Sequence, residues 1–165
     1  MVILIDSREK RNTHIKRYFA ANNIKFATSK LYVGDYQRAD NGQISIDKKF
    51  SLQEVYNCVV SGYKRFAAEC KRAQEAGITL IVLVEDERIT SLYEVNTWEN
   101  PRIKEWEKAR ENGETDIPSL PPISSKRIEA RMTTLSKRYG VKWKFCRKED
   151  TGATIYGILS GETLC

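Results

Sequence analysis

Several features that mark particular classes of protein are scarce in this 165-residue sequence. There is one histidine, His14, and no two of the four cysteines form a Cys-x-x-Cys pair. A structural zinc site needs four closely spaced nitrogen or sulfur ligands, so we set zinc aside. No stretch approaches the roughly 20 apolar residues of a membrane span, and the apolar N-terminus is too short for a signal peptide. We therefore expect a cytoplasmic protein without disulfides, in which Cys58, Cys70, Cys146 and Cys165 are core or incidental thiols.

What the sequence has in excess is positive charge. Lys and Arg outnumber Asp and Glu by 28 to 22, which gives a net charge of +6 and a pI near 9.1. The segment from Ser124 to Lys148 alone holds nine basic residues and one acid, Glu129. Such a patch suits the phosphate backbone of a nucleic acid, with Lys142 and Lys144 on one face of a strand. The alternative for any one of these lysines is that it is simply exposed to solvent and binds nothing.

Hydrophobic patterning predicts one α/β domain over residues 1–165. We expect strands at 2–5, 25–31, 43–47, 78–84 and 141–145, and helices at 13–22, 51–76, 124–139 and 151–159, with another beginning near Thr90. Asp40-Asn41-Gly42 predicts a hairpin turn, and the strand–helix–strand order around 51–76 predicts parallel pairing. Gly113, Pro118, Pro121 and Pro122 predict a flexible loop at 112–122. The sheet is therefore expected to be mixed and flanked by helices.

The first third of the chain places charged groups at the ends of these strands. Cleavage of a phosphodiester bond requires a hard cation, and carboxylates are the ligands that Mg²⁺ prefers. A hairpin brings Asp35 and Asp47 together, and Asp47 and Lys49 share a face because they are two apart on a strand. Lys49 is then placed to orient a water or stabilise developing charge. The alternative is that a chance Asp-x-Lys triplet lies at a solvated strand end.

The order of these groups resembles the XPF-type structure-specific endonucleases of the PD-(D/E)xK superfamily. That family has acid-x-Arg, then Gly-Asp-Tyr, then Glu-Arg-Lys, then a helix acid. This sequence has Asp6-Ser7-Arg8, Gly34-Asp35-Tyr36, Asp47-Lys48-Lys49 and Gln53-Glu54 in the same order. Ser61 to Phe66 resembles the family's glycine-arginine turn, which contributes Arg65. The resemblance is good over 1–85, and the remainder is similar to compact phage and bacterial relatives of the same domain.

The resemblance implies a restriction-endonuclease-like three-layer fold and Mg²⁺-dependent cleavage of branched or junction DNA, with Mn²⁺ as a substitute. Asp35 and Asp47 would bind the metal, and Asp6, Lys49 and Glu54 would complete the catalytic set. Arg8, Lys48 and Arg65, with Lys142 and Lys144, would contact DNA. The resemblance also implies a role in DNA repair or recombination.

Three departures from the family pattern affect this prediction. Aspartate replaces glutamate at 47, and Lys48 replaces an arginine that would grip phosphate bidentately. Counting forward from Asp47 places the helix acid at Gln53, whereas counting back from Gly62 favours Glu54, which we prefer. Family members usually carry a helix-hairpin-helix DNA-binding domain, and we expect this sequence to be too short to include one. We therefore expect DNA specificity to come from the nuclease domain, a homodimer or a partner protein.

Two other functions remain as alternatives. One is a catalytically inactive DNA-binding module on the same fold, which would not need carboxylates facing phosphate. The other is a nucleotide-binding α/β protein, for which the sequence lacks a glycine-rich phosphate loop.

Overall fold

The structure is a computed structural model that describes residues 1–162, so Cys165 lies outside the described part. One six-stranded sheet forms its centre, in the order β2-β1-β3-β4-β5-β6. Its strands are β1 (Val2–Asp6), β2 (Lys25–Ser29), β3 (Tyr36–Arg38), β4 (Ile44–Lys49), β5 (Thr79–Glu85) and β6 (Lys142–Cys146). Strand β3 is antiparallel to both neighbours, and the other pairings are parallel. The predicted mixed sheet is confirmed.

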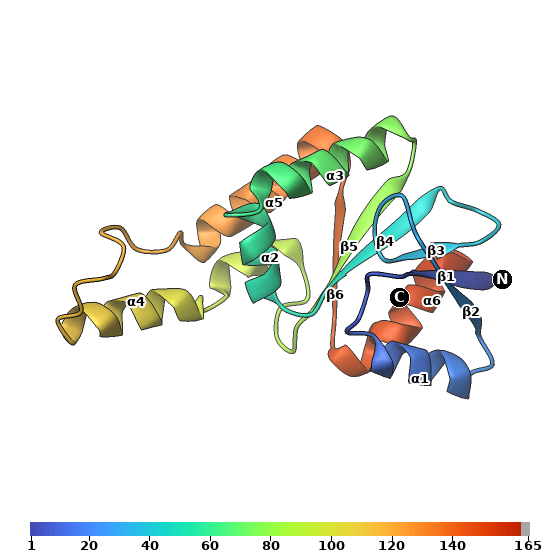
Figure 1. Cartoon of the computed structure of the whole chain (residues 1–165), viewed down its shortest axis with the longest axis horizontal. Coiled ribbons are helices and arrows are strands. Elements are labelled where there is room, and N and C mark those ends of the chain that lie inside the picture. Colours follow the sequence, from blue (N-terminus) through green and yellow to red (C-terminus); the bar gives the residue numbers. More distant parts are fainter. Residues whose placement is uncertain (163–165) are drawn as a thin grey trace.

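Helices cover both faces of this sheet and give the predicted three-layer fold (Figure 1). One face carries α2 (Leu52–Val59), α3 (Tyr63–Glu75) and α5 (Ser125–Tyr139), and the other carries α1 (Thr13–Ala21) and α6 (Thr151–Ser160). The 3₁₀ segments η1 (Leu92–Thr97) and η2 (Lys148–Asp150) follow β5 and β6. None of the helices in residues 1–162 combines the length and apolarity needed to cross a membrane.

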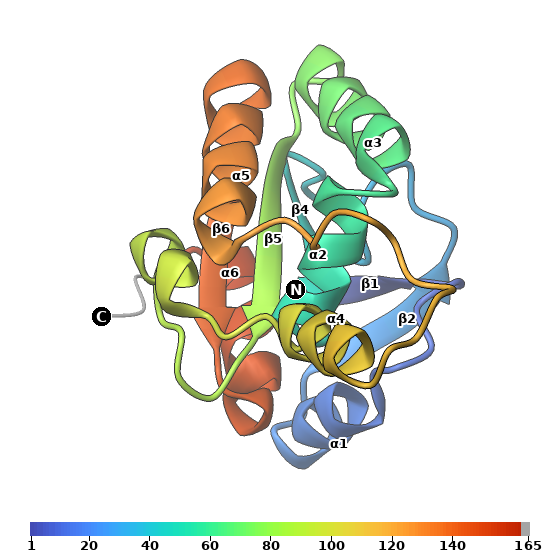
Figure 2. The same cartoon turned by 90° about the vertical axis from the view of Figure 1, so that its left-hand side faces the viewer.

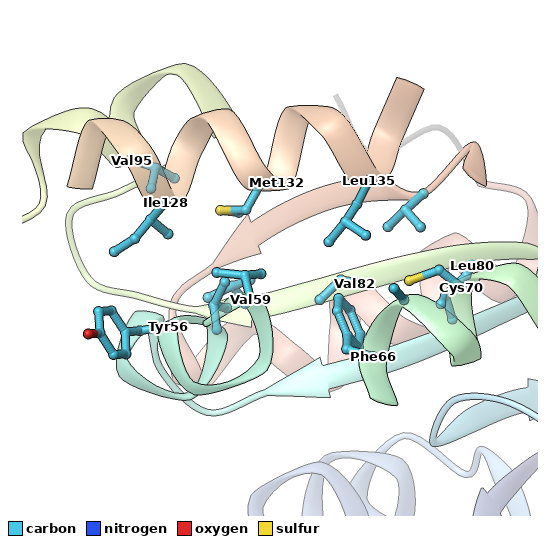
Figure 3. Packing of buried hydrophobic residues seen from close by; sticks show 14 of the residues in the cluster. Tyr56, Val59, Phe66, Cys70, Leu80, Val82, Val95, Ile128, Met132 and Leu135 are labelled. Atoms are coloured by element: carbon cyan, nitrogen blue, oxygen red, sulfur yellow. The ribbon is translucent and has the colours of Figure 1, made fainter. Parts of the chain in front are cut away.

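The alternation of side chains along each strand divides the core into two clusters. On the α2–α3–α5 face, Val82 of β5 packs among Val59, Phe66 and Met132 from the three helices (Figure 3). On the α1–α6 face, Ile46 and Leu83 pack with Phe19 and Ile155. A strand residue therefore faces one cluster or the other according to its parity.

Two sequence predictions about helices are wrong. The helix expected over 51–76 is two helices, because the chain breaks at Val60 (φ −111°, ψ −88°) and restarts after Gly62. The Gly62 N–H donates to the Asn57 carbonyl (2.8 Å), and a Cβ at Gly62 would lie only 3.0 Å from that oxygen. The helix expected from Thr90 is the short η1, and α4 (Pro101–Glu111) begins later, capped by Asn100.

Helix α4 and the segment after it extend from the body of the molecule (Figures 1 and 2). No residue of α4 is buried, although Ile103, Trp106 and Ala109 form a half-buried stripe. Trp106 Nε1 donates to the Pro118 carbonyl (2.8 Å), which folds the segment back along the helix. Residues 112–122 form no helix or strand, as their glycine and prolines predict.

Candidate active site

The parallel strands end at one edge of the sheet, and the charged groups gather there. Asp6 ends β1, and Asp47 to Lys49 end β4. Asp35 directly precedes β3, which runs in the opposite direction and so enters the sheet at this same edge. Topology alone therefore brings together groups that are up to 43 residues apart, from Asp6 to Lys49.

Main-chain hydrogen bonds fix Asp35 beside β4. Its N–H donates to the Ile46 carbonyl (2.7 Å), and its Oδ2 accepts from the Lys48 N–H (2.8 Å). Gly34 before it has φ +69°, and a Cβ there would meet Ser45 Oγ at 2.4 Å, so this turn requires glycine. Burial, and then the Asp47 carboxylate, raise the pKa of Asp35 well above its usual value. Two buried carboxylates thus face each other.

Asp47 and Lys49 form a pair on the α2–α3 face of the sheet. Lys49 Nζ lies 2.8 Å from each Asp47 carboxylate oxygen, and its hydrogen bond goes to Oδ1. Asp47 Oδ2 is buried and accepts no hydrogen bond of good geometry. Burial lowers the pKa of Lys49, but the attraction of Asp47, Cys58 and Asp35 together outweighs burial and raises it overall, so the lysine is held as a cation.

Glu54 stands at the first turn of α2, next to this pair. Ser51 caps the helix by accepting from the Glu54 N–H, and Glu54 Oε2 accepts from the Phe50 N–H (2.8 Å). Burial raises the pKa of Glu54, and Lys49 and Asp47 both act on it electrostatically. The adjacent Gln53 has a buried amide nitrogen without a hydrogen-bond partner. Proximity to the Asp47–Lys49 pair supports Glu54 as the helix acid.

A groove of about 630 Å³ lies beside these groups on the α2–α3 face, and we call it the catalytic groove. Burial raises the pKa of its Cys58 thiol, on which Lys49, Asp47, Glu54 and Arg65 also act electrostatically. The charged cluster and the groove are therefore contiguous. The groove is lined by Phe50, Glu54, Asn57, Cys58, Ser61, Gly62 and Arg65.

Asp6 holds Arg8 in place at the same edge. Arg8 donates from Nε to Asp6 Oδ1 (2.7 Å) and from Nη2 to Oδ2 (3.0 Å), while the Leu31 N–H occupies Oδ2 as well (2.7 Å). Burial raises the pKa of Asp6, but these hydrogen bonds outweigh it and bring the value to about 2. Both oxygens of Asp6 are engaged, so we assign it to positioning Arg8, whose side chain is 67% exposed.

Three predicted DNA contacts lie elsewhere. Lys48 is buried on the α1–α6 side, where its Nζ donates to the Arg11 carbonyl (2.8 Å), and it does not reach the solvent. Lys142 and Lys144 are exposed on edge strand β6, in register with Ile81 and Leu83, which belong to the α1–α6 cluster. Strand parity therefore points both lysines away from the face that bears Asp47 and Lys49.

Sequence reasoning missed Glu69 of α3. Its Oε1 accepts from the Gly34 N–H (3.1 Å), and its charge acts on Arg8. The carboxylate thereby supports the glycine turn that presents Asp35. In the sequence, Glu69 cannot be told apart from an acid on the solvent-exposed side of a helix. Its position three residues after the core residue Phe66 does not mark it as part of a site.

The residues present fit a hard divalent cation with few protein ligands. No group of three or more His, Cys, Asp or Glu side chains within residues 1–162 is arranged to hold a metal ion. Mg²⁺, however, commonly takes one or two carboxylates and fills its other positions with water and substrate phosphate. The mutual repulsion of Asp35 and Asp47, together with an Asp47 Oδ2 that contacts Lys49 but accepts no hydrogen bond of good geometry, suits such an ion.

Comparison with known proteins identifies the family and the fold. The ERCC4 domain model matches residues 5–158. XPF from Aeropyrum pernix has the same fold, with a TM-score of 0.64 and 16% identity over 99% of this chain and 66% of that chain. XPF from Aeropyrum pernix in complex with DNA gives a TM-score of 0.63 and 16% identity over 98% and 64%. This chain thus spans about two thirds of those proteins. No curated protein matches it by sequence. The chain belongs to the ERCC4 domain family, the XPF-type nuclease domains.

Proposed function

We propose that this protein is a metal-dependent endonuclease that hydrolyses phosphodiester bonds in branched DNA. The observation that carries the proposal is the cluster of Asp35, Asp47 and Lys49 next to an open groove. Two buried carboxylates that repel each other are costly to keep charged, and a bound cation would stabilise both in the charged form. A catalytically inactive binding module would gain nothing from this arrangement, because carboxylates repel phosphate.

Asp35 and Asp47 would hold Mg²⁺, or Mn²⁺ in its place. The ion supplies positive charge that polarises the phosphate and lowers the pKa of an attacking water. Lys49, kept protonated by Asp47, would donate a hydrogen bond to that water or to the phosphate oxygens; its hydrogen bond to Asp47 and its raised pKa support this role. Glu54, with its raised pKa, would orient the water from the first turn of α2.

Binding of the DNA backbone would involve basic groups on both sides of the cluster. Arg65 lines the catalytic groove, and Arg8 is held at the same edge by Asp6. The structure of XPF from Aeropyrum pernix with DNA supports a DNA substrate, as does the net charge of +6. Branched DNA as the preferred form is taken from the family, and a homodimer or partner would add specificity.

A cleavage panel tests this function directly. Labelled flap, fork, four-way junction and linear duplex are incubated with Mg²⁺, Mn²⁺ or excess chelator. We expect internal cuts in branched DNA with either metal and none in chelator. Full activity in chelator would contradict the metal assignment, and tight DNA binding without cleavage under all conditions would favour the inactive module.

A further inference from the structure

An exposed aromatic residue stands directly after the Asp47–Lys49 pair. Phe50 follows β4, and 41% of its surface is exposed, although Asp47 and Lys48 of that strand are buried. The Arg11 guanidinium lies 3.9 Å from the centre of its ring. This stacking restrains the ring on one side. Beneath it, buried Lys48 donates to the Arg11 carbonyl and so anchors the loop that carries Arg11.

Phe50 separates two grooves. On one side is the catalytic groove, built mainly from α2 and the start of α3. On the other side is a second groove of about 310 Å³, built from the loop after β1, the start of α1, the end of β5 and η2. The second groove is lined by Arg11, Thr13, His14, Phe50, Glu85 and Lys148. Phe50 is the residue common to both lining sets.

The charges of the second groove favour an anion. Arg11 and Lys148 are both exposed there. Its one lining acid, Glu85, is buried, and its Oε1 accepts from Thr151 Oγ1 (2.9 Å) and contacts His14 Nε2 (2.7 Å). The neighbouring acids Glu149 and Asp150 are paired with Arg147. Glu9 accepts from the Arg11 main-chain N–H and lies 3.8 Å from Lys48 Nζ, and among the described residues neither the Arg11 guanidinium nor the Lys148 ammonium forms an ion pair with a carboxylate.

We propose that Phe50 divides the strands of a branched substrate, stacking against the base at the branch point. One strand would enter the catalytic groove, and the backbone of the strand that is not cut would follow the second groove past Arg11 and Lys148. Single-stranded DNA is bound by this combination of an exposed aromatic ring and a basic groove. Bases within a duplex are already stacked and offer no free face to Phe50, so the ring selects unpaired nucleotides. This inference rests on the proposed function and specifies its substrate form.

Stacking by Phe50 can be measured without cleavage. The Lys49→Ala protein, which is expected to bind but not to cut, is titrated onto a fork that carries 2-aminopurine as the first unpaired nucleotide. We expect its fluorescence to be quenched on binding, with the quench retained in Phe50→Trp and lost in Phe50→Leu. Phe50→Leu should also weaken fork binding roughly tenfold, as expected for loss of one aromatic–base stack. Phe26→Leu, which changes an aromatic residue that is 37% exposed near the amino end of edge strand β2, is the matched control.

The second groove is tested by charge reversal in the same background. Lys148→Glu should lower affinity for the fork more than for linear duplex, whereas Lys25→Glu should affect neither selectively. Lys25 is exposed at the amino end of edge strand β2, opposite the edge that holds the site. Equal quenching in the Phe50→Leu protein, or equal losses for fork and duplex in the Lys148→Glu protein, would overturn the inference. Failure of the wild type to cut any DNA, with these binding results intact, would instead contradict only the proposed function.

Discussion

Lys48 and Lys49 are adjacent in sequence and both are withdrawn from solvent, with side-chain exposures of 2% and 11%, yet they lie on opposite faces of β4. Lys49 points to the α2–α3 face, where it pairs with Asp47 beside the catalytic groove. Lys48 points to the α1–α6 face, where it donates to the Arg11 carbonyl. One-residue alternation along a strand thus separates the lysine for which we propose a catalytic role from a lysine with a structural role.

The same comparison extends to the edge of the sheet as a whole. The α2–α3 face carries two carboxylates that repel each other, a lysine and a groove. The α1–α6 face carries the hydrogen bonds that order the loop after β1. Variants on the first face are therefore expected to change chemistry, and variants on the second to change stability or the placement of DNA.

The largest effect is expected from Asp47→Asn. This change removes the partner of Lys49 and half of the charge facing the metal position. We expect single-turnover cleavage to fall by about 10²–10³-fold, as for loss of a preorganised electrostatic group. Because the defect includes metal binding, raised Mn²⁺ should restore part of the rate. Complete insensitivity of the variant to metal concentration would argue against Asp47 as a ligand.

Lys48→Met should give the complementary result. Methionine keeps an unbranched stem in the buried site but leaves the Arg11 carbonyl without its donor. We expect the free energy of unfolding, measured with urea, to fall by about 1–3 kcal/mol, since a partly buried carbonyl and the Glu9 carboxylate both lose their contact with Lys48. The rate constant for cleavage at saturating DNA, corrected for the folded fraction, should stay within a few-fold of wild type. A hundredfold slower chemical step would place Lys48 in the active site instead.

The smallest effect is expected from Lys142→Glu combined with Lys144→Glu. These exposed residues would contact backbone phosphates, and they lie on the face away from Asp47. Loss of two phosphate contacts should weaken binding to all sequences alike and reduce the slope of log K against log salt by about 1.8. Fluorescence anisotropy titrations at salt concentrations between roughly 50 and 200 mM measure this slope. An unchanged slope would mean that the two lysines are only solvated.

Much of the division of the site between the two faces of the sheet can be predicted from the sequence. Hairpin turns and the alternation of side chains along a strand depend only on residues close together in the chain. The Asp40-Asn41-Gly42 turn predicted the pairing of β3 with β4, and the two-residue spacing placed Asp47 and Lys49 on one face. Parity also placed Lys48 on the other face, but the family motif led us to group it with the DNA contacts. The hydrophobic pattern predicts a continuous helix through Gly62, whereas in the structure Gly62 and Val60 mark the break between α2 and α3.

Other parts of the site depend on contacts between distant segments. The hydrogen bond from Gly34 to Glu69 joins residues 35 apart, and no periodicity in α3 predicts it. The stacking of Arg11 on Phe50 brings together two loops that follow different strands. Such pairs become visible only when the strand order is known, since β1 and β4 are separated in the sheet by β3.

The central claim is that Lys49 acts in the chemical step, and single-turnover cleavage across a Mn²⁺ titration tests it most directly. Wild type and Lys49→Ala are compared at saturating branched DNA, with DNA affinity measured in parallel. The account predicts that Lys49→Ala binds DNA within a few-fold of wild type but cleaves about 10²–10³-fold more slowly at every metal concentration. Cleavage by Lys49→Ala within a few-fold of the wild-type rate would contradict it, and the Asp47–Lys49 pair would then be a structural ion pair at a strand end.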